Sequence, residues 1–557
     1  MDKANKILLI IILIAILIRI FGIGNILTND ESAYSFSIRD REFFSTSNAN
    51  QPPLFHWTGA VIYAIFPFDT IGIRLQPFIF SILNILIVYL ICKRFFSKKI
   101  GLMAAGIMAF SYWHVFGSLM IETNGSSLMF FSLASIYYYF RFNDEKNYKY
   151  LAVSGIFFGL AFLTRITAIL LIGIIGLYHL WQTKKVWKTA KDISLFVMIG
   201  GIIYSIFPIL SFLIDPFFFY QATIGHNLSY VQGGGLFSIS ILIQFLQALI
   251  ISSPLFIGLL LVYLINFDKK RYNKKELMFL IQIIVVFLFY TLIVKDPFRP
   301  VERYFMILIP GLSILGAIGI SKFRFSKKEL MFSAISLLLL LVLLYIPNLM
   351  ESRFIPFYPK TGFINEAIDL NWNFLVPFTG GSGPAGFYIT FTTIALGFIL
   401  AFGFLLIGIY FILMKKNKVA RIFILLFLAA SFAYNFVLIE EYLFSSANPD
   451  IGMINVQIKD YALENDLNEP VYIFRNFALR YYIGEKYDDV RFLDFNNDTA
   501  ESAAILGQEL GEEKASVLFI DFPSIDKDGN LFKTLNECKK RKTFSDKGQT
   551  IGYVFEC

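Results

Sequence analysis

Charged residues are scarce in this sequence, and their scarcity excludes a water-soluble protein. Only 16% of the 557 residues are charged, whereas 56% are hydrophobic and the mean hydropathy is +0.63. Soluble globular domains do not reach this composition. Many apolar runs of about 18 or more residues predict membrane-spanning helices. Strands of an outer-membrane barrel would alternate in polarity, so we predict an all-α polytopic membrane protein.

Cysteine is nearly absent, and its three occurrences are Cys92, Cys538 and Cys557. Cys538 and Cys557 both fall in the polar tail, and the sequence leaves open whether they form a disulfide or stay free thiols. The sequence has no Cys/His spacing typical of a metal site and no Gly-rich, nucleotide-binding loop. No small-residue cleavage site follows the first apolar run, so we expect that run to be a retained helix.

The net charge of +8 comes from basic residues in short loops, which orient helices, so we exclude nucleic-acid binding. About thirteen spans are predicted, at roughly 7–24, 72–92, 100–116, 125–140, 150–163, 166–182, 193–213, 239–265, 277–294, 303–320, 330–346, 387–413 and 422–439. Alternate loops carry six basic clusters, beginning at Lys93, Arg141, Lys184, Lys269, Lys322 and Lys415. The positive-inside rule places these loops and the N-terminus in the cytoplasm, and the C-terminal tail outside a plasma membrane.

The chain divides into a membrane domain, residues 1–439, and a soluble extracytoplasmic domain, residues 440–557. The first outer loop, about 25–71, is long, and we expect short helices in it that lie on the membrane surface. Near 347–386, the Gly380–Pro384 turn predicts a second, more mobile outer element. In the tail we predict a small α/β domain, because short buried strands alternate with helical patterns. The strands are expected at Val471–Phe474, Val490–Leu493, Val517–Phe522 and Ile551–Phe555, and the helices near 477–483 and 499–511.

Two adjacent carboxylates, Asp30 and Glu31, follow directly on the first apolar run. Charge at a bilayer boundary is costly unless it is solvated or paired, so such a pair tends to be functional. The alternative is that they solvate or cap a helix end, and for Glu31 we hold capping or pairing with a nearby Arg equally open.

Other polar residues gather on the predicted outer side. The carboxylates Asp30 and Glu122, together with the cations Lys295, Arg299 and Arg303, suit a reaction between an acceptor hydroxyl or amine and a lipid-linked phosphate. A carboxylate accepts the proton of the acceptor as general base, while Arg and Lys neutralise a leaving phosphate. Arg165, at a sharp turn between two helices, is interpreted as an anchor at the membrane interface.

A set of motifs resembles the membrane glycosyltransferases of the GT-C fold, in particular the protein O-mannosyltransferase and lipid A aminoarabinose transferase group. The motifs, which fall in residues 1–320, are Asn29-Asp30-Glu31-Ser32-Ala33-Tyr34, Gln51-Pro52-Pro53-Leu54-Phe55, Arg74-Leu75, Glu122, and Arg303-Tyr304 followed by Pro310. The resemblance implies a polyprenyl-phosphate sugar donor (dolichyl or undecaprenyl), an inverting mechanism and no required cofactor. The acceptor would be a protein, lipid or glycan.

Residue roles follow from the same resemblance. Asp30 resembles the catalytic base, with Glu31 and Glu122 as further acidic residues of the pocket. The residues expected at the donor phosphate or lipid are Tyr34, Gln51, Arg74, His226, Lys295, Arg299, Arg303 and Tyr304. Relatives with Lys before Pro-Pro use it near the phosphate, whereas this chain has Gln51, so Arg299 or Lys295 is the expected substitute. Arg74, at a helix start, also suits a structural partner of an acidic residue, and His226 suits a surface position.

Two alternatives remain open from the sequence. The first is an oligosaccharyltransferase-like enzyme with a lipid-diphosphate donor and a divalent metal held by Asp30 and Glu122, since a two-carboxylate site with water and substrate oxygens suits a hard cation. The second is a lipid or solute transporter, which predicts ionisable residues at mid-membrane depth and repeated halves. Neither feature is evident in the sequence. Neither the sugar nor the acceptor is identified by the sequence.

Overall fold

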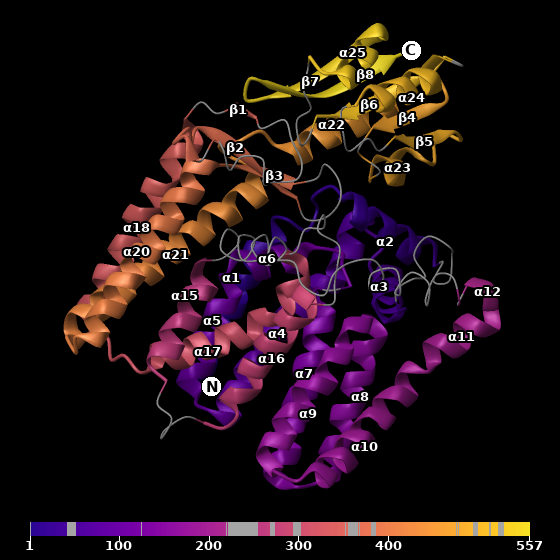
Figure 1. Cartoon of the computed structure of the whole chain (residues 1–557). Coiled ribbons are helices and arrows are strands. Elements are labelled where there is room, and N and C mark those ends of the chain that lie inside the picture. The colour runs from indigo at the N-terminus through magenta and orange to yellow at the C-terminus, as the bar shows by residue number, and fades with distance from the viewer. Residues whose placement is uncertain are drawn as a thin grey trace.

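A long helical region carries a small sheet region at one end, as Figure 1 shows for the computed structural model. The structure describes residues 2–41, 52–123, 125–218, 220, 254–267, 273–292, 302–350, 353–354, 366, 368–379, 386–474, 476, 478–493, 499–511, 514–521 and 528–557. At positions 29, 30, 218, 291, 292, 302, 303, 353, 354, 377 and 379 the backbone alone is described. The mainly helical architecture with a small C-terminal α/β region agrees with the predicted fold class.

Seven of the described helices are long and apolar enough to cross a membrane, or eight if the bent pair α5–α6 counts as one span. The predicted number of thirteen spans is not confirmed. The seven candidate spans are α4 (Asp69–Phe95), η1 (Ile166–Ile169) with α9 (Leu170–Thr183), α10 (Val186–Tyr204) with α11 (Ile206–Ile214), η3 (Glu302–Leu308) with α17 (Ile309–Ser321), α18 (Lys327–Tyr345) with η4 (Ile346–Leu349), α20 (Phe391–Leu413) and α21 (Asn417–Phe444). Further helices of this region are α1 (Lys3–Ile20), α7 (Ser126–Glu145), α8 (Tyr148–Thr164), α12 (Pro216–Phe218), α15 (Pro254–Ile265) and α16 (Glu276–Leu292).

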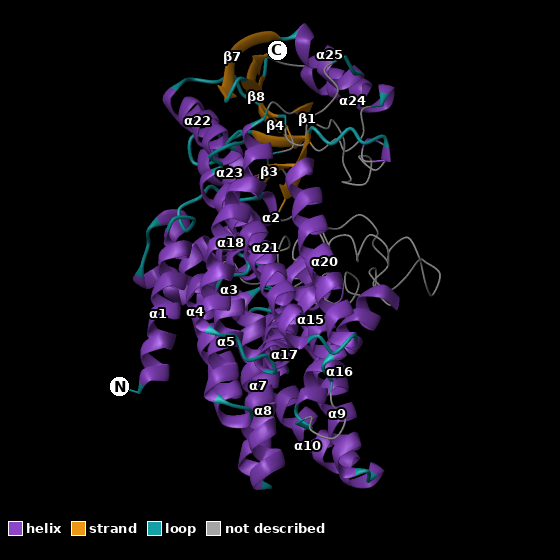
Figure 2. Cartoon of the chain, turned by 90° about the vertical axis from the view of Figure 1, so that its left-hand side faces the viewer, coloured by secondary structure: helices purple, strands orange, loops and turns teal. Residues whose placement is uncertain are grey.

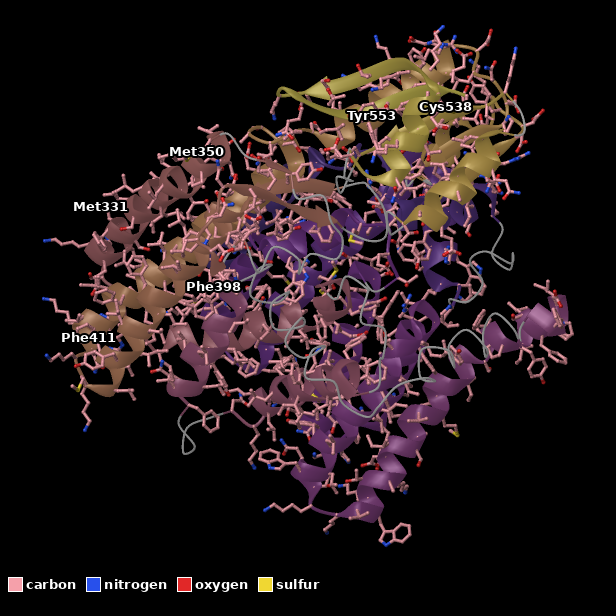
Figure 3. The ribbon with its side chains drawn as sticks, turned by 45° about the horizontal axis from the view of Figure 1, so that its top comes forward. Met331, Met350, Phe398, Phe411, Cys538 and Tyr553 are labelled. Atoms are coloured by element: carbon pink, nitrogen blue, oxygen red, sulfur yellow. A yellow bond between two sulfur atoms is a disulfide. The ribbon has the colours of Figure 1, made fainter. Side chains whose placement is uncertain are left out.

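The outer face of the helical region is apolar, as contact with lipid requires. Met331 on α18 and Leu406 on α20 are 63% and 62% exposed. Figure 3 labels Met331 on α18, and Phe398 and Phe411 on α20, along this side. Buried Phe, Tyr and Leu side chains of α7, α9, α15 and α17 instead form the main core. These helices are therefore arranged with a packed interior and an apolar exterior.

The predicted helix at 100–116 is broken into two, which corrects that prediction. α5 (Lys98–Ala109) and α6 (Tyr112–Leu119) meet at an angle of 64°. The Ser111 side chain accepts a hydrogen bond from the His114 amide and so caps the start of α6. Arg19 of α1 donates to the Ala109 carbonyl at the end of α5, 3.2 Å away. Side-chain hydrogen bonds therefore satisfy backbone groups that the break frees.

The first outer loop contains two helices, α2 (Asn29–Asp40) and α3 (Leu54–Ile65), as the sequence predicted. Figure 1 shows both above α7 and α8 and below α23 (Ala478–Ile483) of the C-terminal region, and Figure 2 shows α2 directly below the strands. α2 begins with a capping box, because Thr28 accepts from the Glu31 amide while Glu31 accepts from the Thr28 amide. α3 begins directly after Pro53, which the first turn of a helix tolerates.

A small sheet replaces the start of the helix predicted at 387–413. β3 (Gly386–Thr390) pairs antiparallel with β2 (Phe374–Thr379), and β1 (Arg353–Phe354) pairs parallel with β2. The aromatic and β-branched residues at 387–389 favour a strand, and α20 begins only at Phe391. The Gly380–Pro384 turn lies outside the described residues. The described part of this loop thus contains paired strands, and the mobility of the loop stays a prediction.

The C-terminal region is a five-stranded sheet with the order β5-β4-β6-β8-β7. The predicted strands are present as β4 (Val471–Phe474), β5 (Val490–Leu493), β6 (Ser516–Ile520) and β8 (Gln549–Glu556), and β7 (Lys539–Asp546) is additional. Helices α22 (Ile451–Glu464) and α23 (Ala478–Ile483) cover one face, while α24 (Ala500–Gly511) and α25 (Asn530–Glu537) cover the other. Cys538 and Cys557 form a disulfide, which answers the question that the sequence left open.

The C-terminal region contacts α2 through α23. Ala478 and Tyr481 share a hydrophobic cluster with Leu27, Ile38 and four further buried residues from α3, α4 and the loop after α6. The Arg39 guanidinium lies 4.6 Å from the centre of the Tyr481 ring. The Tyr482 hydroxyl accepts a hydrogen bond from the Leu27 amide, one residue before Thr28. The tail therefore supports the segment that carries the two adjacent carboxylates.

Candidate active site

Glu31 is buried at the start of α2 and accepts three hydrogen bonds. Its Oε2 atom accepts from the Thr28 amide at 2.8 Å and from Arg74 Nη2 at 2.9 Å, and its Oε1 atom accepts from the Ile121 amide at 3.0 Å. The side chain is 2% exposed. Of the two roles that the sequence allowed for Glu31, capping and pairing with Arg, the structure contains both.

The Arg74 guanidinium, from α4, pairs with Glu31 and also binds the backbone before α2. Besides Glu31, it donates to the carbonyl oxygens of Asn25 and Ile26. A buried ion pair offsets the cost of removing both charges from water only when further hydrogen bonds satisfy its remaining polar atoms. The guanidinium thus fixes the turn that precedes α2, which supports the structural interpretation of Arg74. Whether Glu31 or Arg74 also contacts a substrate stays a prediction.

Asp30 lies in the first turn of α2, between Thr28 and Glu31, and its carboxylate is outside the described side chains. Position 30 is one helical turn before Tyr34, so the two positions share a face of α2. Thr28 and Glu31, the capping pair, lie on a different side of the same turn. The fixed backbone therefore gives position 30 a defined place beside the residues that surround Tyr34.

Tyr34, Glu122, Arg165, Tyr290 and Tyr304 come together from five separate segments at this face. The other four side chains all lie close enough to Arg165 for their charged forms to affect its guanidinium. Its Nη1 atom lies 3.9 Å from Glu122 Oε1, and the Glu122 side chain is 1% exposed. The rings of Tyr290 and Tyr304 are 5.4 Å apart. We call these five residues the Arg165 cluster.

The loop between α6 and α7 fixes Glu122. The Thr123 hydroxyl donates to Glu122 Oε1 at 3.0 Å and accepts from Arg165 Nη1 at 2.7 Å. The Gly125 amide closes a turn on the Glu122 carbonyl, as the sequence suggested for this position. Glu31 holds the neighbouring Ile121 amide, so the two acidic residues are joined through one short backbone segment.

Arg165 was not among the predicted site residues, because a basic residue at a helix end is usually an interface anchor. The helix break between α8 and η1 instead directs it inward, and the extended backbone at Arg165 was not evident from the sequence. Apart from its bond to Thr123, its guanidinium makes no hydrogen bond with the described residues, and Nε is buried. The remaining N–H groups have the fork geometry that suits phosphate oxygens.

His56 of α3 is buried beside Tyr34, with the two ring centres 5.5 Å apart. Neither ring nitrogen has a hydrogen-bond partner among the described residues. Burial lowers the pKa of His56 to about 4, so the imidazole is neutral at pH 7. A neutral imidazole does not supply charge to a phosphate, and His56 adds to the apolar wall behind Tyr34.

Several predicted site residues, namely Gln51, His226, Lys295 and Arg299, lie outside the described residues. Arg303 is described by its backbone alone, in η3 next to Tyr304. Within the described chain, no three His, Cys, Asp or Glu side chains are grouped as a metal site requires. The Asp30 side chain lies outside the described residues, so a divalent ion at Asp30 and Glu122 stays a prediction.

Comparison with known proteins agrees with this architecture. The family model described as dolichyl-phosphate-mannose-protein mannosyltransferase matches residues 50–212. The crystal structure of ArnT from Cupriavidus metallidurans in the apo state is similar with a TM-score of 0.60 and 13% identity, covering 100% of this chain and 98% of that chain. The structure of ArnT from the same organism bound to undecaprenyl phosphate matches with a TM-score of 0.60, 12% identity and the same coverage. No curated protein sequence matches the chain.

Proposed function

We propose that this chain, which has the GT-C fold and resembles the mannosyltransferase and aminoarabinose transferase group, is a polyprenyl-phosphate-dependent membrane glycosyltransferase. It transfers one hexosyl or pentosyl unit from dolichyl or undecaprenyl phosphate to a hydroxyl or amine of a protein, lipid or glycan. The observation that carries the proposal is the Arg165 cluster, which lies on the face of α2 that contains position 30.

The reaction follows from the chemistry of these groups. Asp30 accepts the proton of the acceptor group, whose oxygen or nitrogen forms a bond to the anomeric carbon of the donor. The bond between that carbon and the phosphate oxygen breaks, so the configuration inverts and polyprenyl phosphate leaves with the electron pair. Arg165 and Arg303 stabilise the negative charge on the leaving phosphate. Glu122 holds Arg165 in place through Thr123.

The donor class is tested with purified protein in lipid nanodiscs. We expect transfer or slow hydrolysis of the sugar from a polyprenyl-phosphate sugar when no nucleotide sugar is present. The absence of a Gly-rich phosphate loop supports this expectation. Mass spectrometry of released sugar and of polyprenyl phosphate gives the measurement, with Asp30→Asn as the matched control.

Two outcomes of this experiment would contradict the proposed donor or mechanism. Turnover with a nucleotide sugar alone, in a preparation freed of polyprenyl lipid, would show that the proposed donor is wrong. Activity that disappears with a chelator and returns with a divalent cation would instead favour the metal-dependent alternative.

The active site and the tail both face the extracytoplasmic side in our proposal. Residues 1–439 form the transferase domain and residues 440–557 form a domain that supports its outer face. The Cys538–Cys557 disulfide supports an oxidising compartment for the tail. The basic clusters in alternate loops support a cytoplasmic location for the opposite ends of the helices.

Orientation is tested at the two ends of α21. Lys416→Cys and Ser446→Cys flank this helix, and both positions are exposed. Among native cysteines, Cys92 is buried and the other two are paired, so background labelling is low. In intact cells an impermeant maleimide should label Ser446→Cys and not Lys416→Cys. The reverse pattern would invert the orientation, and permeabilised cells provide the control for both sites.

A further inference from the structure

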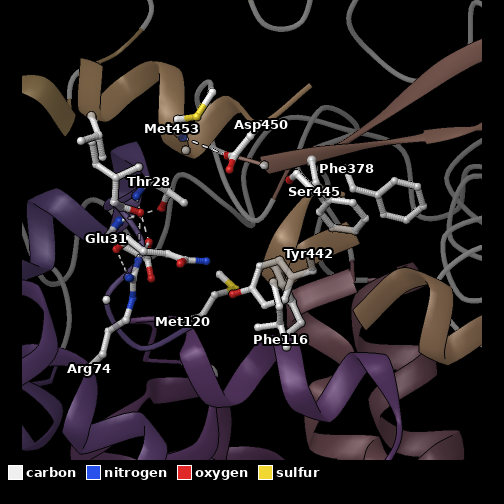
Figure 4. A pocket seen from close by; sticks show the side chains of 18 residues that line it. Thr28, Glu31, Arg74, Phe116, Met120, Phe378, Tyr442, Ser445, Asp450 and Met453 are labelled. Atoms are coloured by element: carbon white, nitrogen blue, oxygen red, sulfur yellow. Dashed lines mark hydrogen bonds and ion pairs between the residues drawn. The ribbon is translucent and has the colours of Figure 1, made fainter. Parts of the chain in front are cut away.

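A cavity of about 220 Å³ lies on the side of α2 that carries Thr28 and Glu31. Its walls come from the start of α2, the ends of α6 and α21, the hairpin β2–β3, and α22 of the C-terminal region. Figure 4 shows the Glu31–Arg74 pair on one side and aromatic rings on the other. None of the roles proposed above uses this cavity.

The size of the cavity limits what it can hold. Its volume equals roughly seven water molecules at about 30 Å³ each. Pockets for drug-sized ligands are larger, on the order of 300–1,000 Å³. A polyprenyl chain or a folded peptide segment is therefore too large, whereas a single sugar ring is of the right size.

Four aromatic residues form one wall of the cavity: Phe116, Phe378, Phe387 and Tyr442. The ring of Tyr442 lies 5.3 Å from that of Phe116 and 5.8 Å from that of Phe387. Phe378 and Phe387 are stacked, with ring centres 5.1 Å apart. Because these rings fix one another, they present a rigid apolar face, and apolar faces with a few polar groups are typical of small-molecule sites.

Polar groups with unused hydrogen-bonding capacity complete the lining. The Tyr442 hydroxyl faces the Glu31–Arg74 pair across the cavity and makes no hydrogen bond within the described chain (Figure 4). Asn25 also lines the cavity, and its side-chain amide has no such bond there. A hydroxyl and an amide together offer donors and acceptors that match the hydroxyl groups of a sugar.

The charge of the walls excludes an anion. Arg74 is the single cation among the described lining residues, and Glu31 already neutralises it. Asp450 adds a carboxylate that accepts from the Met453 amide at the start of α22. Burial raises the pKa of Asp450, which reflects its partly enclosed position. A phosphate group would meet one carboxylate and no free cation, so an uncharged ligand is favoured.

We propose that this cavity is a carbohydrate subsite that binds one uncharged sugar ring. Its role rests on the proposed glycosyl transfer, because Thr28 and Glu31 of its wall flank Asp30 in the chain. The ring belongs either to a glycan acceptor or to the sugar of the donor. Since the C-terminal region contributes α22 to the wall, the subsite is complete only when that region is docked.

Cysteine protection measures binding without relying on activity. Met453→Cys places a thiol on the cavity wall, and Leu463→Cys places one elsewhere on α22; the native side chains are 38% and 41% exposed. A neutral methyl glycoside of glucose, galactose or mannose should slow maleimide labelling of Met453→Cys about fourfold at about three times its Kd. Labelling of Leu463→Cys should not change.

A second variant tests the contacts inside the cavity. Tyr442→Phe retains the ring and removes the hydroxyl, so it should weaken protection by about two- to tenfold, the value of one hydrogen bond. Glucose 6-phosphate should protect less than glucose, because the walls carry no free cation. Stronger protection by the phosphorylated sugar would overturn the assignment of an uncharged ligand.

The source of the ring is decided by the same assay. Protection by methyl glycosides alone assigns the subsite to an acceptor glycan. Protection by a polyprenyl-phosphate sugar, but neither by free glycosides nor by polyprenyl phosphate, assigns it to the donor sugar. If no sugar protects Met453→Cys, the subsite is refuted, while donor turnover by the same protein still tests the proposed function separately.

Discussion

Replacing Asp30 with Asn should lower turnover by about 10²–10⁴-fold, the usual contribution of a general base. The substitution keeps the size of the side chain and most of its hydrogen-bonding capacity, while it removes the negative charge that accepts the proton. Donor affinity should change much less, because the effect is confined to the transition state. Initial rates at varied donor concentration, with the purified variant in nanodiscs, separate kcat from KM.

Glu122→Gln is the matched control, since it changes a buried carboxylate that belongs to the Arg165 cluster. We expect a smaller loss, because Glu122 holds Arg165 through Thr123 and an amide can still accept the Thr123 hydroxyl hydrogen bond. A near wild-type rate for Asp30→Asn together with an inactive Glu122→Gln would transfer the role of base to Glu122.

The sequence predicted much of the fold, because the length and spacing of apolar runs indicate where helices and strands form. The runs at Val471–Phe474 and Val490–Leu493 became strands with those bounds. The first is buried as predicted, whereas the second lies at the edge of the sheet and is only partly buried, which corrects that prediction. Such runs are short, β-branched or aromatic, and flanked by turn residues, so local pattern suffices. Two features were not predicted: the helix break at Phe110–Ser111 and the strand Gly386–Thr390. Both lie in apolar runs, and an apolar run in a membrane protein is compatible with a continuous helix as well as with a buried strand.

The candidate site was predicted in part, and the missing part depended on tertiary packing. Glu31 and Arg74 are 43 residues apart. The sequence suggested a structural partner for each, because an unpaired charge costs free energy when it is buried, but it did not show that the two pair with each other. Arg165 and the sugar-sized cavity had no such signal. The position of Arg165 depends on the direction of a side chain at a helix break, and the cavity depends on four distant segments that meet at the start of α2.

Replacing Arg74 with Met should destabilise the protein by about 3–5 kcal/mol, because it leaves the Glu31 carboxylate buried without its cation. The loss reaches beyond one pair: Arg74 also donates to the carbonyls of Asn25 and Ile26, and Glu31 holds the amides of Thr28 and Ile121. The start of α2 and the segment before Glu122 should loosen together. A lower Tm in scanning fluorimetry and faster hydrogen exchange at residues 25–31 and 119–123 would measure both effects.

The double variant Glu31→Gln/Arg74→Met supplies the control, because it removes both charges while Gln keeps the capacity to accept the Thr28 and Ile121 amides. Its Tm should lie above that of Arg74→Met alone, and measuring Glu31→Gln as well completes a double-mutant cycle that gives the coupling of the pair. Surface pairs are worth at most about 1 kcal/mol, so Arg94→Met, which breaks the exposed pair with Glu145, should change the Tm little. If Arg74→Met unfolds at the wild-type temperature, or if the double variant is the less stable of the two, the buried pair does not anchor the start of α2, and Asp30 must be positioned by other contacts.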